Sequence, residues 1–361
     1  MNFTNKAIAI LGIITALGGL MIAARVTLHS SGNAQQSQTQ IPVNQRYSIV
    51  NLDTLNSRAS VAKKINNNGQ VVGFFNPNDS TQKAFIYSDG KMTEINSLNS
   101  RYNAATSIND NGEIVGVMTF PDDNYHAFYY KNGKTIDLGT FGGKSSDARS
   151  INGKGQIVGF ADTSDEKAHA FLYSNGKKID LGTFGGANSY ANDINENGQV
   201  VGSAENSVSE AFRRNRIPQA FLYSGGKMVN LGTLGGQSST ANSINNQGQI
   251  VGVADTANHR PQAFLYKNGK MTNLGTLGGQ SSIANSINNL GQVVGEAEDA
   301  SRIPRAFLYS GDRMIDLNHV IPANSGWDLT SATDISDRGV IVGIGTYNGK
   351  TQAFQLTPFA R

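Results

Sequence analysis

The chain of 361 residues lacks several features that would tie it to a familiar chemistry. It has no cysteine, which excludes disulfide bonds, thiolate metal sites and cysteine nucleophiles. Charged residues make up only 16% and the net charge is +3, too balanced to predict a nucleic-acid partner. The motifs G-x-S-x-G and H-E-x-x-H and the phosphate-binding loop ending in Lys-Ser/Thr are also absent. No motif therefore indicates an enzyme class, a cofactor or a metal site.

A long uncharged hydrophobic run stands at the N-terminus, from Ala7 to Ala24 after Lys6. Its length suits either the core of a signal peptide or a minimal transmembrane helix, so cleavage and membrane anchoring through residues 7–24 both stay open. Residues 30–45 are polar and predict a flexible linker. We therefore expect a signal peptide or membrane anchor over 1–29, a linker over 30–45 and a folded domain over 46–361. Either fate of the N-terminus predicts an extracytoplasmic location: secreted, periplasmic or at the cell surface.

What the chain has in plenty is glycine, 41 residues in all, much of it within a repeated motif. The motif "IN..GQ.VG" occurs seven times, the last copy being the altered "ISDRGVIVG". Its first residue is Ile65, Ile108, Ile151, Ile194, Ile244, Ile287 and Ile335. A second anchor, the aromatic residue of an "AF" pair, keeps the same count at Phe85, Phe128, Phe171, Phe221, Phe264, Phe307 and Phe354. Because the two anchors agree, the register of the repeat is secure.

Each unit of about 43 residues predicts four short antiparallel strands, as in "ANSIN", "QIVGVA", "QAFLYK" and "KMTNLG". A period of 40 to 50 with four strands per unit is typical of a β-propeller, whose blades stack around a central channel. The N-terminal segment "RYSIVNLDTL" aligns with the fourth strand of a unit, and the C-terminal "TQAFQLTP" aligns with the third. The sequence thus predicts an all-β, seven-bladed propeller whose last blade is closed by the N-terminal strand.

The units resemble the HAF repeats of bacterial proteins assigned to the extracellular space. The His-Ala-Phe triplets at 126–128 and 169–171 carry this resemblance, which covers roughly Arg46 to Pro358. It implies an extracellular setting and brings no established activity. The other five copies replace the histidine by Lys83, Gln219, Gln262, Arg305 and Gln352, so no shared metal or catalytic role follows from it.

The recurrent residues predict packing rather than chemistry. We expect the "AF" phenylalanines to fill the space between neighbouring blades, and the glycine ending "IVG" to permit either a close approach between blades or a bulge. "GTLGG" reads as a loop joining strand to strand. Residues 193–198 match the opening of a calcium loop, D-x-[DN]-x-[DN]-G, but Ala204 stands where its final glutamate belongs. A hairpin whose asparagine caps its own backbone is the favoured interpretation there.

Candidate binding residues lie where the copies differ, because shared positions are explained by packing. The variable loop between the second and third strands should share one rim of the disc with "GTLGG". Its loops are acidic in the first three blades, with Asp79, Asp122, Asp123, Asp162, Asp165 and Glu166. They are basic in the next three, with Arg213, Arg214, Arg216, His259, Arg260, Arg302 and Arg305. This basic half of the rim predicts an anionic polysaccharide or protein partner, and simple solvation of these loops is the alternative.

Two further features leave alternatives open. The single tryptophan, Trp327, follows an irregular joint in the last unit and either stacks on a sugar or seals a gap. Asp147, Asp193 and Asp334 lie at or beside the innermost strands, and converging carboxylates would suit a hydrolase or lyase. Blades 4 and 7 lie nearly opposite each other, which argues against convergence. The sequence favours an exported, non-catalytic binding or scaffolding module over a propeller enzyme and over a purely structural surface domain.

Overall fold

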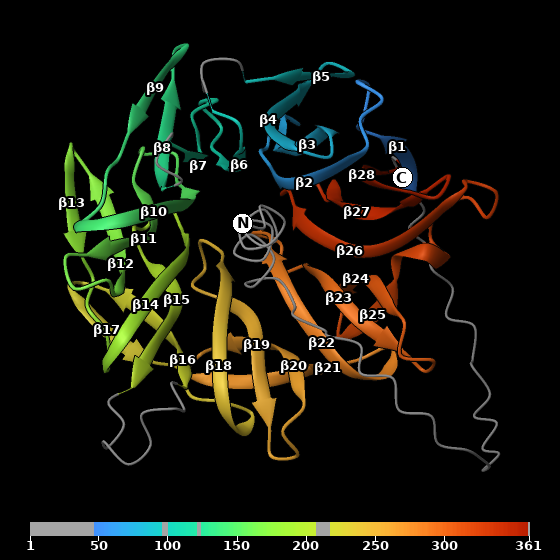
Figure 1. Cartoon of the computed structure of the whole chain (residues 1–361). Coiled ribbons are helices and arrows are strands. Elements are labelled where there is room, and N and C mark those ends of the chain that lie inside the picture. Colours follow the sequence, from blue (N-terminus) through green and yellow to red (C-terminus); the bar gives the residue numbers. More distant parts are fainter. Residues whose placement is uncertain (1–46, 96–99, 121–123, 207–216, 360–361) are drawn as a thin grey trace, which may run out of the picture.

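The computed structural model describes residues 47–95, 100–120, 124–206 and 217–359. Within these ranges the chain forms seven four-stranded antiparallel sheets that follow one another around a central axis (Figure 1). The prediction of a seven-bladed propeller is confirmed. The proposed signal peptide or anchor and the linker lie outside the described residues.

Every blade uses the same order of strands, from the channel outward. The blades comprise, in turn, β2 (Ala59–Ile65), β3 (Val71–Asn78), β4 (Thr81–Ser88) and β5 (Lys91–Glu94); β6 (Asn103–Ile108), β7 (Ile114–Thr119), β8 (Tyr125–Lys131) and β9 (Lys134–Asp137); β10 (Gly142–Ile151), β11 (Ile157–Thr163), β12 (Ala168–Ser174) and β13 (Lys177–Asp180); β14 (Gly185–Ile194), β15 (Val200–Asn206), β16 (Pro218–Ser224) and β17 (Lys227–Asn230); β18 (Gly235–Ile244), β19 (Ile250–Thr256), β20 (Pro261–Lys267) and β21 (Lys270–Gly275); β22 (Gly278–Ile287), β23 (Val293–Asp299), β24 (Pro304–Ser310) and β25 (Arg313–Asp316); and β26 (Trp327–Ile335), β27 (Ile341–Tyr347), β28 (Lys350–Pro358) and β1 (Tyr47–Asn51). A short 3-10 helix, η2 (Leu317–His319), precedes β26.

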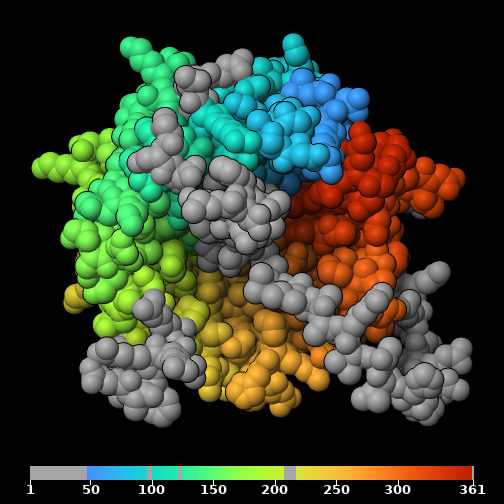
Figure 2. All heavy atoms as spheres, in the orientation of Figure 1, coloured from blue at the N-terminus to red at the C-terminus, as the bar shows by residue number. Residues whose placement is uncertain are grey.

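The ring closes as the sequence predicts, through the outermost strand of blade 7. The N-terminal strand β1 pairs antiparallel with β28, with Tyr47 opposite Pro358 and Asn51 opposite Phe354. Figure 2 shows the red C-terminal blade lying directly against the blue N-terminal part of the chain. Both ends of the described fold therefore stabilise one sheet, and neither end leaves an unpaired blade.

The recurrent phenylalanines pack between blades, which confirms the prediction. All seven are fully buried. Phe264 of blade 5, for example, shares a core cluster with Val201 and Ala220 of blade 4. Burying such a side chain contributes about 1.5 to 3 kcal/mol, so the inter-blade cores are a principal source of stability.

The glycine of "IVG" serves a bulge inside the blade rather than an approach between blades. A Cβ on Gly252 would lie 2.0 Å from the carbonyl oxygen of Thr240 on the neighbouring strand β18. The register of β18 against β19 shifts between Ala241 and Ser243, beside this contact. The glycine thus lets the bulged inner strand press its backbone against the second strand.

The "GTLGG" loop is shorter than predicted, because its last two glycines already belong to the inner strand. In blade 5 the strand β18 begins at Gly235, whose φ is +99°. A Cβ on Gly236 would lie 2.5 Å from the carbonyl oxygen of Thr256 at the end of β19. Only glycine permits the backbone to approach this closely. The start of the inner strand thereby lies directly against the end of the second strand.

A ring of asparagine side chains joins six of the seven blades to the next one around the channel. The amide of Asn245 donates from Nδ2 to the carbonyl oxygen of Asn288 in blade 6, at 3.1 Å. Its Oδ1 accepts the backbone N–H groups of Gln247 and Gln249 in its own turn. The same inter-blade bond, at 3.0 Å, is made by Asn66, Asn109, Asn152, Asn195 and Asn288. Ser336 holds this position in blade 7 and accepts the bond from Asn288.

The next residue along the chain forms a second ring. The N–H of Asn67 donates to the carboxylate of Asp110, and the N–H of Asn289 donates to that of Asp337, both at 2.8 Å. The backbone N–H of Asp337 donates in turn to Asn67 Oδ1, which joins blade 7 to blade 1. In blade 3 this position is Gly153, which lacks a side chain to accept a bond. Ser336 has no side-chain amide and does not make the asparagine bond from blade 7 to blade 1. The second ring supplies a link between these two blades instead.

Substituting Gly252→Ala should destabilise the fold by about 3 kcal/mol, because the added methyl group overlaps backbone that cannot move without breaking the sheet. Gly269→Ala is the control. Gly269 has φ +78° and open space around its Cβ position, so only the left-handed backbone is strained, at about 1–2 kcal/mol. Urea denaturation of the two variants measures the difference, and equal losses would contradict the bulge argument.

Substituting Asn245→Asp should lower the free energy of unfolding by about 2–4 kcal/mol, because a carboxylate oxygen then faces the carbonyl of Asn288 and the amide oxygen of Gln249 without a proton to donate. Asn246→Asp, one residue further, is the matched control. Asn246 accepts its bond from the N–H of Glu196 through Oδ1, and blades 2 and 7 carry aspartate at this position. Its change should stay within about 0.5 kcal/mol. Equal effects at both positions would refute the role of the asparagine ring.

Candidate functional site

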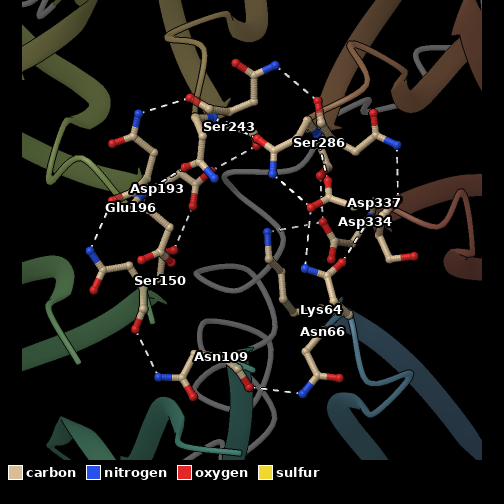
Figure 3. A pocket seen from close by; sticks show the side chains of 18 of the residues that line it. Lys64, Asn66, Asn109, Ser150, Asp193, Glu196, Ser243, Ser286, Asp334 and Asp337 are labelled. Atoms are coloured by element: carbon tan, nitrogen blue, oxygen red, sulfur yellow. Dashed lines mark hydrogen bonds and ion pairs between the residues drawn. The ribbon is translucent and has the colours of Figure 1, made fainter. Parts of the chain in front are cut away.

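The ends of the inner strands surround a cavity of about 330 Å³ at the mouth of the channel (Figure 3). All seven blades contribute to its lining, mainly through the two hydrogen-bonded rings described above. We call this end, where the first and second strands of each blade are joined, the hairpin end. A second space of about 120 Å³ lies deeper and shares Lys64, Asp193 and Asp334 with the first. Two polar spaces therefore follow one another along the channel and share a layer of lining side chains.

Lys64 of β2 projects into the cavity from blade 1 (Figure 3). Its Nζ lies 3.2 Å from Oδ1 of Asp334 on blade 7. Burial alone would lower the pKa of Lys64, but the carboxylates of Asp334 and Asp193 outweigh it and raise that pKa above its usual value. Asp193 and Asp334 thus line opposite parts of one cavity and act on the same lysine.

Asp193 ties blade 4 to both of its neighbours. Its Oδ1 accepts from Ser150 Oγ at 2.7 Å, and its Oδ2 accepts from Ser243 Oγ at 2.9 Å and from the N–H of Ile244 at 3.0 Å. Both oxygens are therefore occupied by hydrogen bonds to adjacent blades.

Asp334 has an equivalent set of partners in blades 6 and 1. Its Oδ1 accepts from Ser286 Oγ at 2.6 Å, and its Oδ2 accepts from the N–H of Ile65 at 2.9 Å. These carboxylates are committed to structure, so the geometry does not favour the acid-base chemistry of a hydrolase or lyase.

The turn that matches the start of a calcium loop is held by its own asparagine, as the hairpin interpretation predicts. Asn195 Oδ1 accepts from the N–H groups of Asn197 and Gln199, both at 3.0 Å. Asp193, the first residue of the motif, instead bonds to neighbouring blades. Over the described ranges, no three His, Cys, Asp or Glu side chains are grouped so as to hold a metal ion.

The deeper level of the channel contains the residues where the inner strands differ most. Two positions before the repeated isoleucine, most blades carry a side chain that donates to a carbonyl in the next blade. Thr106, Asn192, Asn242, Asn285 and Thr333 make this bond, at 2.6 to 3.0 Å. Blades 1 and 3 carry Lys63 and Arg149 instead, and neither makes it.

Arg149 is held on the channel wall by aromatic rings and by one carboxylate. Its guanidinium lies 4.8 Å from the ring centre of Phe160 and 5.3 Å from that of Tyr190. Its NH1 donates to Asn192 Oδ1 at 2.6 Å, and its Nε lies 3.6 Å from Asp147 Oδ2. Burial raises the pKa of Asp147 despite the opposing effect of Arg149.

Lys63 faces this wall without a hydrogen-bond acceptor for its ammonium group among the described residues. The nearest aromatic contact is Phe74, 5.8 Å from Nζ to the ring centre. Burial lowers the pKa of Lys63 to about 8, against a smaller opposing effect of Asp147. Perturbed lysines and carboxyls of this kind cluster at functional sites.

Sequence reasoning missed Lys63 and Arg149, and it named Asp147 only as a possible catalytic acid. A column-by-column alignment of the seven inner strands would have exposed both positions, because Asn or Thr stands in the other five blades.

Four of the seven residues of the predicted basic rim lie among the described residues. Arg213, Arg214 and Arg216 lie outside the described residues. His259 and Arg260 are exposed in the turn between β19 and β20, and Arg302 is exposed in the turn between β23 and β24, in the neighbouring blade. Arg305 belongs to β24 and is ion-paired with Asp299 and Asp328.

The predicted acidic half of the rim is largely neutralised by partners in the described residues. Asp79 pairs with Arg58, Asp165 with Lys167, and Glu166 with Lys144. Asp162 accepts the N–H of Ser145, and Asp122 and Asp123 lie outside the described residues. The acid-base asymmetry therefore reduces to the exposed basic residues of blades 5 and 6.

Trp327 starts the inner strand of blade 7 and is half-buried. Its ring stacks on Tyr347 with the ring centres 4.9 Å apart and contacts Phe354 edge-on at 6.0 Å. It also packs against the core of the closing blade. This arrangement favours the interpretation of a seal at the irregular joint.

The histidines of the two His-Ala-Phe triplets lie on the third strand and pair with the fourth. His126 Nδ1 lies 2.9 Å from Asp137, and His169 Nδ1 lies 2.7 Å from Asp180. In blade 1 the equivalent pair is Lys83 with Glu94. These contacts explain the position by cross-strand pairing within a blade.

The described part of the chain contains no helix long and apolar enough to cross a membrane.

Comparison with known proteins shows the fold and leaves the activity open. A family model described as a protein of unknown function (DUF3466) matches residues 180–234 and 276–357, less than half of the chain. No curated protein matches. The β-propeller domain of the Trilobed protease from Pyrococcus furiosus, reported with an open velcro topology, is 11% identical, with a TM-score of 0.56 over 83% of this chain and 94% of that domain.

Two further solved structures share the fold. A puromycin-hydrolysing peptidase of Mycobacterium tuberculosis is 10% identical, with a TM-score of 0.55 over 85% of this chain but only 53% of the peptidase. YCF48 bound to D1 peptide is 11% identical, with a TM-score of 0.53 over 88% of this chain and 96% of that one. At such identities these likenesses show the fold alone, and propellers host many unrelated functions.

Proposed function

We propose that this propeller is an exported, non-catalytic binding module whose rim contacts a carboxylate-bearing polymer, an acidic polysaccharide in the first place. One observation carries the proposal: on blades 5 and 6 the exposed side chains of His259, Arg260 and Arg302 have no acidic partner among the described residues, whereas the acids of the opposite loops are paired. We call these three residues the basic arc.

Acidic side chains near the basic arc are turned toward the backbone. Asp255 accepts from Ser238, and Glu298 accepts the N–H groups of Gln280 and Ser281. Their bonds hold the first residues of the inner strands β18 and β22. The arc thus presents arginine donors outward over a rigid base, the arrangement that suits fork-like contact with carboxylates.

Export of the protein is a separate part of the proposal. It rests on the hydrophobic run from Ala7 to Ala24 and on the resemblance to HAF repeats, and it puts the rim where cell-surface and extracellular polymers occur.

The test is a double charge reversal, Arg260→Glu with Arg302→Glu, in the full-length protein. Binding to a polyuronate such as alginate should weaken by at least about tenfold at low salt, since each reversal replaces an attraction with a repulsion. Biolayer interferometry with immobilised polymer measures the loss. Polyglutamate serves as a second probe, and a preference for it would indicate an acidic protein partner instead.

Lys227→Glu with Lys270→Glu is the matched control. These exposed lysines begin β17 and β21, next to the turns on the opposite rim, and their reversal changes the net charge by the same amount. Polymer binding that falls equally in both double variants would reduce the interaction to net charge and defeat the proposal.

A further inference from the structure

The deeper channel space has charges of opposite sign at two successive levels. At the first level, Lys63 and Arg149 carry two positive charges and the neighbouring Asp147 carries one negative charge, which leaves a net charge of about +1. Asp193 and Asp334 against Lys64 leave an excess of one negative charge at the next level toward the hairpin end. Lys63, Arg149, Asp193 and Asp334 line the same space of about 120 Å³. Outside this space, Glu296 on the second strand of blade 6 hydrogen bonds to Ser331 of blade 7, and burial raises its pKa.

Lys63 and Arg149 occupy positions whose ordinary residue stabilises the ring. Thr106 in the blade between them donates to the carbonyl of Ala148 at 2.6 Å, and Asn192 after them donates to that of Ala241 at 2.8 Å. Lys63 and Arg149 forgo the equivalent bond. Replacing a stabilising residue by a desolvated charge is the pattern expected of a site kept for function rather than stability.

The same wall also leaves buried polar atoms without partners. Ser107 Oγ and Asp147 Oδ1 are enclosed and have no hydrogen-bond partner. Ser107 lines the deeper space, and Asp147 lies beside Arg149. Unsatisfied buried groups are rare in native proteins and call for an explanation such as an absent ligand or water.

We propose that this space binds a small zwitterion, the chemistry of a free amino acid, with its carboxylate between Lys63 and Arg149 and its ammonium group toward Asp193 and Asp334. A simple anion suits the channel less well, because Asp110, Glu196 and Asp337 line the mouth at the hairpin end. A simple cation would be repelled by Lys63 and Arg149 and would carry no negative group to offset that repulsion. A ligand that carries both charges matches both levels, and an apolar cavity of about 150 Å³ is known to accept a molecule as large as benzene, so the size is adequate.

This inference concerns the channel and is independent of the basic arc. Charge reversal of Arg260 and Arg302 should leave zwitterion binding unchanged, and loss of Lys63 should leave polymer binding unchanged. The two proposals can therefore fail separately.

The first arm of the test compares ligands on the unaltered full-length protein by isothermal titration calorimetry. The probes are glycine and L-alanine, with propionate and ethylamine as analogues that each lack one charge. The amino acids should bind, and each analogue should bind at least about tenfold more weakly, because it leaves one charged level without its partner. Absence of amino-acid binding at millimolar concentration, or equal binding of propionate and alanine, would overturn the proposal.

The second arm uses Lys63→Asn, which installs the residue that blades 4, 5 and 6 carry at this position. It should weaken alanine binding by at least about tenfold. It should also raise the Tm by about 2 °C, the shift expected when one hydrogen bond is added to a domain of this size. Lys177→Asn, at an exposed position that begins β13, is the charge-matched control and should change neither. Undiminished binding in Lys63→Asn would place the ligand elsewhere and refute the assignment.

Discussion

The structure depends on one side-chain amide repeated around the channel. Each ring asparagine accepts the N–H groups of its own turn through Oδ1 and donates through Nδ2 to a carbonyl of the next blade, as Asn195 does toward Asn245. Both sets of bonds form together only when neighbouring blades hold a fixed spacing and angle. The amide thereby couples the shape of a local hairpin to the geometry of the whole ring. The buried phenylalanines stabilise the contact between blades, but apolar packing is non-directional and would not by itself fix that angle.

The inner surface of the ring follows from the same constraint. The asparagine ring surrounds the hairpin end, and the residues just before it line a polar channel. There Asp193 and Asp334 bond to serines and N–H groups of adjacent blades and hold Lys64 in its charged form. Carboxylates used in this way stabilise the ring and are poorly suited to catalysis. The channel is best understood as a charged, preorganised cavity, and the similarity of its seven walls makes the exceptions at Lys63 and Arg149 easy to recognise.

Sequence spacing predicts the fold well because the relevant signals are local and repeated. The recurrence of Phe264 and its equivalents, the Asn-Gly turns and the match between the chain ends suffice to predict seven blades and their closure by β1. The charge pattern of the rim is another matter, because its pairing crosses loops and blades. Lys144 reaches Glu166 across 22 residues, and Arg305 pairs with Asp328 of the next blade. The role of Asn245 is hidden for a different reason: capping its own turn already explains it locally, so nothing in the sequence calls for a second partner 43 residues away.

The deeper channel shows how a repeat protein can carry a site without a recognisable motif. Because the blades are nearly identical, the residue expected at each position is known from the other copies. A different residue indicates a function only where the usual residue has a known structural role. For a variable loop residue such as Arg302 the other blades predict no particular residue, since exposed turns tolerate most side chains. At the position of Lys63 the task is known, because five other blades use it to bond their neighbour. A lysine at this position gives up that bond and places a partly desolvated ammonium group, without an acceptor among the described residues, on the channel wall. Such a residue persists when a ligand supplies the missing partner, which is why the channel is the stronger place to look for binding chemistry.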